Sequence, residues 1–343
     1  MKDSNLKESN NLYGFRDKEL FEKTIKAVTL LSEVVRYFPE MIFKGGTSVL
    51  LRTGKLERLS IDIDIILDKK EESGLSEKLA MLSGKSKFFK SVEENRRQSL
   101  LDKMHFKFYY DSEFGKKDQY VLLDAVFMNN PYYKLEKKDL EKCEIVKGLK
   151  GFVNVPTAEG LYADKLVAIS AKTLGIDYNN QKEMEYCKQL IDLGILFKEI
   201  EDVKDLRESF NRIVISENLF QKENFAIVDV KKDLENLAMN YCAYSLKSMS
   251  SISSDTKMIN MGLKMLGNHL LNKYSVDEIK VIFSQVVYVL EMISDSKKKA
   301  IRKGYETSEI KNARLNDKYK ILERLKRVNP DAYAYWYYAK GES

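Results

Sequence analysis

Residues Lys44–Leu67 read KGGTSVLLRTGKLERLSIDIDIIL, and this stretch decides the fold. Its last part, SIDIDIIL at 60–67, alternates polar and apolar side chains, which predicts a β-strand. Asp62 and Asp64 then share one face of the strand, and isoleucines occupy the other. Two like charges so close are costly on a partly buried surface unless a cation lies between them, and carboxylate oxygens suit Mg²⁺ or Mn²⁺. We therefore interpret these aspartates as ligands of a divalent metal.

A glycine pair precedes this strand and is followed directly by two hydroxyl side chains. Gly45 and Gly46 let the backbone approach a ligand closely. Thr47 and Ser48 open a predicted helix, where backbone amides without helical partners attract anions. Taken by itself, the glycine pair is also expected in an ordinary tight turn, and the two aspartates are also expected as ordinary surface residues. In this order, the two features together predict a site for the phosphates of a nucleotide.

A third carboxylate is expected from a neighbouring strand, because two-metal sites for phosphoryl or nucleotidyl transfer use shared ligands. Asp124 is the candidate. It interrupts the apolar segment QYVLLDAVFM at 119–128, where an isolated acid is costly unless it binds a metal or is paired. The alternative is a hydrogen-bonded structural aspartate at a strand end.

Hydrophobic periodicity separates a mixed first part of the chain from a helical second part. Before Pro156 we predict helices at 16–38 and from 47, and strands at 41–44, 60–67, 104–110 and 120–128. After Pro156 we predict helices from 157 and at 181–200, 230–247, 258–274, 276–303 and 308–328. We expect an α/β (α+β) domain at 1–200, with its motif core at 40–200, and a helical C-terminal domain at 201–343.

The composition excludes several classes of protein. Of 343 residues, 44% are apolar and 32% are charged, which is typical of a globular chain. The 3 cysteines form no CxxC pair and the 2 histidines no HExxH site, which argues against disulfide frameworks, zinc sites and imidazole-based hydrolases. The N-terminus lacks the apolar core of a secretory signal, and the apolar stretch 281–293 is too short to cross a membrane. We expect a cytoplasmic protein without a membrane segment.

Other distinctive residues have ordinary explanations. We expect structural or surface roles for the two histidines, His105 and His269. We expect buried thiols at the three cysteines, Cys143, Cys187 and Cys242. Helical spacing predicts core positions for Met258, Met261 and Met265.

The positive charge is concentrated near the C-terminus. Between Lys297 and Arg327 there are 12 Lys or Arg and 4 Asp or Glu, a net +8, whereas the whole chain carries +6. This basic tail is followed by the aromatic residues Tyr333, Tyr335, Trp336, Tyr337 and Tyr338. Such a stretch attracts phosphates and stacks on bases, or it forms a solvated helix face with an aromatic stripe that closes a core. Both interpretations stay open.

The motif residues resemble a known superfamily. Gly45–Ser48 with Arg58, Ser60, Asp62 and Asp64 resemble the GG[ST] and DxD signature of the DNA polymerase β-like nucleotidyltransferases. The form KGGTS…RLSIDIDI is similar to the AbiEii/AbiGii toxin branch, the toxin halves of bacterial toxin–antitoxin and abortive-infection pairs.

Two downstream segments extend this resemblance over residues 40–200. AEGLYADKLVAIS at 158–170 resembles a family helix whose lysine maps to Lys165. CKQLIDLGILF at 187–197 resembles the family's RDxxDL element, whose final acid maps to Asp192. Lys188 and Gln189 stand where the family pattern has Arg and Asp.

The resemblance implies a polymerase β-like core with a mixed sheet and a Mg²⁺- or Mn²⁺-dependent toxin that moves a nucleoside monophosphate from an NTP to an acceptor. The implied acceptor is the 3′ end of tRNA, and the implied protein partner is a cognate antitoxin. The implied catalytic residues are Asp62, Asp64, Asp124, Lys165 and Asp192, of which the first three bind metal. The implied nucleotide-binding residues are Gly45, Gly46, Thr47, Ser48 and Lys165. The expected acceptor-binding residues of the basic tail are Lys297, Lys298, Lys299, Arg302 and Lys303.

Two alternatives stay open. The first keeps the chemistry but transfers the nucleotide to a protein or small-molecule hydroxyl, in which case the basic tail is dispensable for activity. The second is a non-catalytic module that binds GTP or RNA and releases no pyrophosphate.

Overall fold

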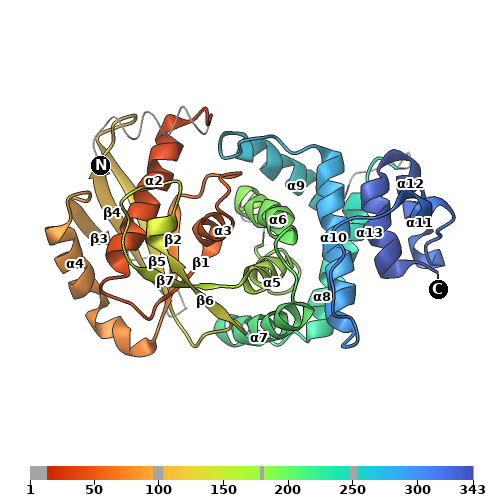
Figure 1. Ribbon diagram of the computed structural model, residues 1–343, viewed down its shortest axis with the longest axis horizontal. Coiled ribbons are helices and arrows are strands. Elements are labelled where there is room, and N and C mark those ends of the chain that lie inside the picture. Colours follow the sequence, from red (N-terminus) through yellow and green to blue (C-terminus); the bar gives the residue numbers. More distant parts are fainter. Residues whose placement is uncertain (1–13, 96–102, 178–180, 247–252, 343) are drawn as a thin grey trace. The chain divides into compact units, whose positions relative to one another are not determined.

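The computed structural model describes residues 14–95, 103–177, 181–246 and 253–342. The chain divides into two compact units (Figure 1). The first, which we call the sheet unit, comprises Met1–Thr157 together with Asn268–Asn272. The second, the helical unit, comprises Ala158–Gly267 and Lys273–Ser343.

The division falls before helix α5 (Ala158–Ala168), whereas the sequence places the domain boundary near residue 200. The two positions differ because α5 packs against α6 (Glu183–Phe197) and α7 (Val203–Gln221), and α6 packs against further helices of the same unit. The motif segments that carry Lys165 and Asp192 therefore belong to the helical unit.

In its described residues, the sheet unit contains a seven-stranded sheet in the order β3-β4-β5-β2-β1-β7-β6. The strands are β1 (Ile42–Lys44), β2 (Asp62–Leu67), β3 (Ser91–Glu94), β4 (Lys103–Asp111), β5 (Asp118–Phe127), β6 (Leu135–Asp139) and β7 (Phe152–Pro156). The pairs β2/β5 and β1/β7 are parallel, and the other neighbours are antiparallel. A mixed sheet with helices confirms the predicted α/β class.

The four predicted strands appear as β1, β2, β4 and β5, and the sequence analysis missed three others. Two of these, β3 (SVEE) and β6 (LEKKD), form the two edges of the sheet. An edge strand buries little apolar surface, so its sequence lacks the alternation that predicts a strand.

One face of the sheet carries the hydrophobic core of this unit. Ile63 and Ile65 of β2 are fully buried there, together with Phe106 of β4 and Leu123 of β5. Helix α2 (Lys18–Val34) packs against β2 and β5, and its apolar residues join this core, as do those of α4 (Leu75–Lys85). The intervening residues of the same strands, Asp62 and Asp64 among them, therefore lie on the opposite face.

The helical unit is built around α10 (Val276–Ser294), which packs against α8 (Ile227–Ala243) and α13 (Pro330–Lys340). Its other α-helices are α5, α6, α7, α9 (Ser254–Met265), α11 (Thr307–Lys311) and α12 (Leu325–Val328). Short 3₁₀ segments are η1 (Lys69–Gly74) and η2 (Leu140–Lys142) in the first part of the chain, and η4 (Leu266–Asn268) and η5 (Asp317–Arg324) in the second.

Two of the predicted helices near the C-terminus are wrong in extent. The helix predicted at 276–303 ends at Ser294, because the lysine-rich segment that follows has no apolar face to bury. The segment 308–328 forms α11, η5 and α12 instead of one helix.

The aromatic residues after the basic tail close a core. Tyr333 and Trp336 are fully buried and Tyr335 is 5% exposed. Tyr335 packs edge-on against Phe197 at 5.3 Å between ring centroids. The base-stacking interpretation is therefore wrong for these three side chains.

The methionines of α9 also depart from expectation. Met261 and Met265 are 51% and 54% exposed, so the prediction of core positions is wrong for both. The buried side of the helix is the side of Gly262. A Cβ on this glycine would lie 2.2 Å from the Glu183 carbonyl oxygen, which shows how closely α9 approaches α6. Close backbone contact with α6 thus decides which side of α9 faces solvent.

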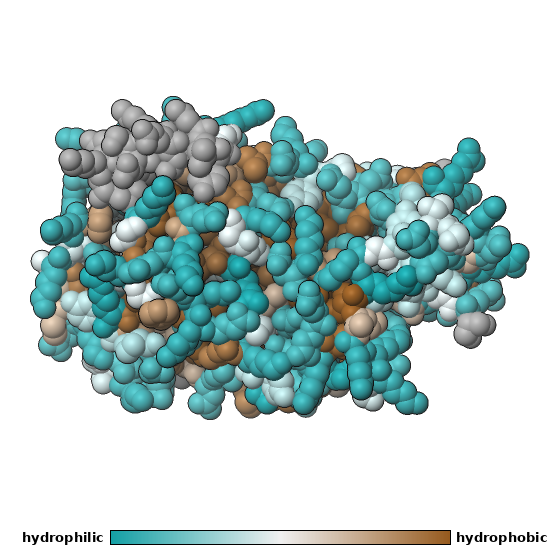
Figure 2. All heavy atoms as spheres, viewed as in Figure 1, coloured by the Kyte–Doolittle hydropathy of each residue, from teal (hydrophilic) through white to brown (hydrophobic). Residues whose placement is uncertain are grey.

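The described surface and the cysteines agree with the composition. Hydrophilic side chains cover most of the face shown in Figure 2. Cys143, Cys187 and Cys242 are buried free thiols, as predicted, and burial raises the pKa of Cys187 to about 12. Among the helices that the structure describes, none has the length and apolarity needed to span a bilayer.

We predict that Gly262→Ala destabilises the helical unit by about 1–3 kcal/mol, because the added methyl group meets the α6 backbone. The matched change Met261→Ala, on the exposed side of the same helix, is expected to stay within about 0.5 kcal/mol. Thermal unfolding followed by circular dichroism measures both. A melting temperature of Gly262→Ala equal to that of the wild type would contradict the close packing of α6 and α9.

Candidate active site

Three aspartates lie on the face of the sheet opposite the hydrophobic core, which we call the open face. In the parallel pair β2/β5, Asp64 is directly opposite Asp124, and Asp62 is opposite Leu122. All three aspartates are partly exposed, whereas Ile63 between the first two is fully buried. In the described residues, no three His, Cys, Asp or Glu side chains are placed to hold a metal by themselves. Mg²⁺ commonly takes one or two protein carboxylates together with substrate phosphates, so this donor set suits a nucleotide-bound ion.

A histidine that the sequence analysis treated as ordinary contacts this group. His105 of β4 is paired in register with Asp124, and its Nδ1 lies 2.7 Å from Asp124 Oδ1. The histidine side chain is 11% exposed and the aspartate 30%. The alternation in KMHFKFYYD indicates that His105 and Lys107 share a face, but the partner across the strand follows only from the register.

The glycine pair brings the start of helix α3 (Gly45–Thr53) against the aspartate strand. Gly45 has a φ of +79°, and a Cβ there would lie 1.9 Å from Asp64 Oδ2. A Cβ on Gly46 would lie 2.4 Å from Arg58 Nη2 and 2.8 Å from Ser60 Oγ. Only glycine fits at the first position, because both the backbone conformation and the space exclude a side chain.

The two hydroxyl residues fasten this turn. Thr47 Oγ1 donates to the carbonyl oxygen of Asp62 at 2.7 Å, and Ser48 Oγ donates to that of Gly45 at 2.7 Å. Both side chains are buried. Thr47 therefore ties the beginning of α3 to the strand that carries the aspartates, and Ser48 closes the first turn of the helix on itself.

A segment far away in the sequence supports the loop before β2. Leu59 N–H donates to the His269 carbonyl oxygen at 2.7 Å, and Leu271 N–H donates to that of Glu57 at 3.0 Å. Arg58, which lies between these two bonds, is buried. His269 is buried as well, in keeping with a structural role.

Lys165 and Asp192 meet in the helical unit. Lys165 Nζ lies 3.3 Å from Asp192 Oδ2, with side chains that are 3% and 1% exposed. The same ammonium group donates to Gln189 Oε1 at 2.6 Å. Gln189, one of the two residues that depart from the family pattern, thus belongs to this buried cluster. Asp192 compensates a lysine charge that would be costly to bury alone.

The five residues of the basic tail separate into two groups. Lys298 pairs with Glu291, Arg302 pairs with Glu309 and stacks over Tyr338, and the Lys303 ammonium donates to the carbonyl oxygens of Phe197 and Ile200 at the end of α6. Lys297 and Lys299 are exposed, and in the described part of the chain neither ammonium group is seen to make a bond; the Lys297 backbone N–H donates to Asp295 Oδ1 at 2.9 Å.

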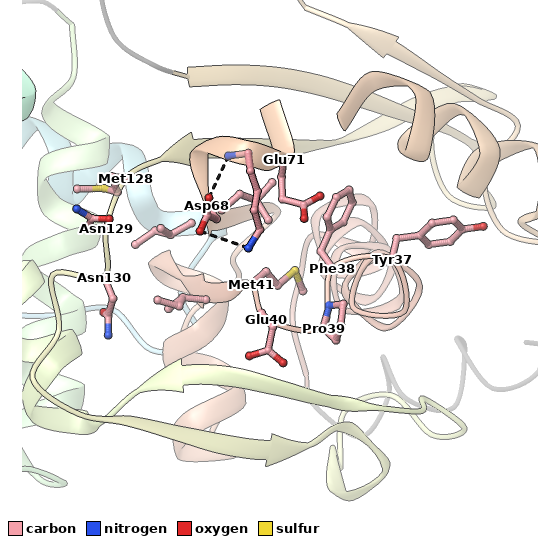
Figure 3. Close-up of a pocket in the computed structure, with 14 residues that line it drawn as sticks. Tyr37, Phe38, Pro39, Glu40, Met41, Asp68, Glu71, Met128, Asn129 and Asn130 are labelled. Atoms are coloured by element: carbon pink, nitrogen blue, oxygen red, sulfur yellow. Dashed lines mark hydrogen bonds and ion pairs between the residues drawn. The ribbon is translucent and has the colours of Figure 1, made fainter. Parts of the chain in front are cut away.

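A cavity of about 350 Å³ lies at the other end of the same strands (Figure 3). Its lining includes Met41 before β1, Asp68 after β2 and Met128 after β5. Asp62 begins β2, and Asp68 follows its last residue. The cavity is therefore separate from the aspartate group and is not part of this site.

Comparison with known proteins gives a family from a sequence model and a fold from a solved structure. A family model described as "Nucleotidyl transferase AbiEii toxin, Type IV TA system" matches residues 29–251. MenT4, a nucleotidyltransferase toxin from Mycobacterium tuberculosis, is similar in structure over 91% of this chain and 92% of its own, with 14% identity and a TM-score of 0.51. JHP933 from Helicobacter pylori is similar over 80% of this chain and 94% of its own, with 14% identity and a TM-score of 0.46. No curated protein sequence matches this chain. The similarity to MenT4 shows a shared fold.

We predict that Gly45→Ala displaces the Asp64 carboxylate and weakens Mn²⁺ binding in the presence of nucleotide by at least tenfold. Gly54→Ala is the matched control, because Gly54 also has a positive φ, +65°, but nothing lies within 4 Å of its Cβ position. Both variants carry a similar backbone strain of about 1–2 kcal/mol. Electron paramagnetic resonance titration with Mn²⁺ measures the binding. Equal weakening in both variants would assign the effect to strain instead of to Asp64.

Proposed function

The chain belongs to the AbiEii family of nucleotidyltransferase toxins of type IV toxin–antitoxin systems, and we propose that it transfers a nucleoside monophosphate from an NTP to the 3′ end of tRNA, releasing pyrophosphate. The observation that carries the proposal is the register of the parallel pair β2/β5, which places Asp64 opposite Asp124 beside the Gly45 turn.

In this proposal Asp62, Asp64 and Asp124 hold Mg²⁺ or Mn²⁺ together with the phosphates of the nucleotide. A bound metal supplies positive charge to the phosphates and lowers the pKa of the attacking hydroxyl. His105 holds the Asp124 carboxylate through its Nδ1 contact, so it orients one of the proposed ligands.

The triphosphate is proposed to bind at the start of α3. The first backbone amides of a helix have no helical acceptor and attract anions. Gly45 and Gly46 let this turn lie against the side chains of Asp64 and Arg58, and the bonds of Thr47 and Ser48 hold the turn in place.

Lys165 is proposed to act on the departing pyrophosphate, because an ammonium group stabilises negative charge that develops on it. Asp192 and Gln189 hold the ammonium group before the substrate arrives. Of these two partners, Asp192 is charged and Gln189 is neutral. Together they therefore carry one negative charge, which balances the positive charge of the ammonium group.

RNA is proposed to meet the exposed lysines of the tail, Lys297 and Lys299, since phosphates attract mobile surface cations. Lys298, Arg302 and Lys303 hold the tail through the bonds described above, so their contribution to RNA binding is smaller. A cognate antitoxin that controls the toxin completes the proposal.

We predict that Asp64→Asn lowers nucleotide transfer by orders of magnitude, because it removes one metal-ligand charge with almost no change in volume. Asp68→Asn is the matched control, since Asp68 is an exposed aspartate just beyond the same strand. Purified protein is incubated with each labelled NTP, Mg²⁺ and total RNA, and the labelled band is identified; EDTA is expected to abolish it. Full activity of Asp64→Asn would overturn the proposed site, and a label on protein instead of RNA would overturn the acceptor.

We predict that Lys297→Gln with Lys299→Gln weakens RNA binding and lowers the slope of log K against log salt by about 0.7–0.9 for each RNA phosphate that the variant no longer neutralises. Lys303→Gln instead lowers the free energy of unfolding by roughly 1 kcal/mol, and with it the melting temperature, because it removes a cation from the end of α6. Filter binding at several salt concentrations and thermal unfolding separate the two effects. An unchanged salt slope in the double variant would show that the tail does not contact RNA.

A further inference from the structure

The open face of the sheet continues beyond the aspartates onto β4 and β5. Register pairs Lys107 with Leu122 and Tyr109 with Tyr120, and the alternation places all four on the face of Asp124. Tyr109 and Tyr120 form an edge-on pair with 5.8 Å between ring centroids. Lys107 and both tyrosines are partly exposed, so this face is accessible beside the candidate active site.

Two lysines from different elements meet at the Tyr120 ring. Lys107 Nζ of β4 lies 5.2 Å from the ring centroid, and Lys23 Nζ of α2 lies 4.6 Å from it. Lys23 has room there because β2 begins at Asp62, opposite Leu122, so the first residues of β5 extend beyond β2. Tyr120 lies two residues before Leu122, which is about 7 Å along the strand.

Charges of both signs surround this ring. Burial lowers the pKa of Lys23, and the Asp62 and Glu19 carboxylates oppose this shift. On the outer side, Glu93 is opposite Lys107 and accepts a hydrogen bond of 2.7 Å from the Tyr109 hydroxyl group. Each of the two ammonium groups at this ring is a donor from which an RNA phosphate can accept a charge-assisted hydrogen bond.

The position of this cluster distinguishes the two substrates. The Gly45 turn, proposed for the triphosphate, lies on the β1 side of the aspartates, because β1 pairs with β2 and Lys44 is opposite Asp64. The lysine cluster lies on the β5 side. In phosphoryl transfer the attacking and leaving oxygens are roughly in line, on opposite sides of the phosphorus. The cluster therefore lies on the side of the attacking hydroxyl group.

We propose that Lys23 and Lys107, gathered at Tyr120, bind the last phosphodiester of the acceptor RNA, next to its 3′ hydroxyl group. This inference rests on the proposed function and names the part of the acceptor that the sheet unit holds. Tyr120 keeps both ammonium groups in place before RNA arrives, which lowers the entropic cost of binding. The cluster sets the distance between the 3′ end and the aspartates.

The first experiment compares Lys107→Gln and Lys23→Gln with Lys26→Gln. Lys26 is one turn from Lys23 on α2 and lies 5.3 Å from the ring of the buried Tyr110, so its variant removes the same charge and the same kind of contact elsewhere. Binding of a fluorescent single-stranded RNA is measured at several salt concentrations, with NTP binding measured in parallel. We expect each variant at Tyr120 to weaken RNA binding 3- to 30-fold and to lower the salt slope by about 0.7, with NTP affinity and Lys26→Gln unchanged.

The second experiment replaces the last phosphodiester of the RNA by a neutral methylphosphonate. We expect this RNA to bind the wild type more weakly than unmodified RNA does. We expect the double variant Lys107→Gln with Lys23→Gln to bind both RNAs equally well, because it has removed both lysines that the phosphate would meet. An RNA with the methylphosphonate five linkages upstream is the control. We expect the wild type to bind this RNA more tightly than the variant does, as it binds unmodified RNA.

The outcomes separate the two proposals. If the wild type labels RNA but Lys107→Gln and Lys23→Gln bind RNA like Lys26→Gln, the lysine cluster is not the acceptor site. If these variants lose NTP affinity instead, the cluster binds the triphosphate and the inference is wrong. A wild type that labels no RNA overturns the proposed function, and this site with it.

Discussion

Mutual repulsion among carboxylates on one face of a sheet is the constraint on which the arrangement of the sheet unit depends. Asp64 faces Asp124 across parallel strands, and Asp62 lies one step along the same face. Such a group is tolerated where positive charge approaches it. The glycine turn brings the start of α3, whose first backbone amides have no helical acceptor, against Asp64. This repulsion is the physical reason for proposing that a metal and a nucleotide bind at this face.

The helical unit contains a buried cation, whose charge must be compensated. Lys165 lies almost without solvent contact, and its ammonium group has a carboxylate and an amide oxygen as partners. These two partners hold the lysine side chain in one orientation. Gln189, where the family pattern has Asp, gives the lysine a hydrogen-bond acceptor without a negative charge.

Much of the core could be predicted because its signals are local. The alternation in SIDIDIIL identified β2 and the face that its aspartates share, and the glycine pair located the turn. Prediction failed where the outcome depended on packing. Met261 has the helical spacing of a core residue, but Gly262 beside it lets α9 approach α6, so the methionine faces solvent. Tyr333 and Trp336 resembled a base-binding stripe and instead close a core.

By itself, the sequence determined which residue types and which faces were available: two aspartates on one side of a strand, two glycines before a helix, and a lysine and an acid on later helices. Only the tertiary structure decided which of these meet. His105 contacts Asp124, Lys107 and Lys23 meet at Tyr120, and residues 268–272 brace the loop at Arg58. The reason is physical: side-chain periodicity is set by the local backbone, whereas strand register and the return of distant segments are set by the packing of the whole core.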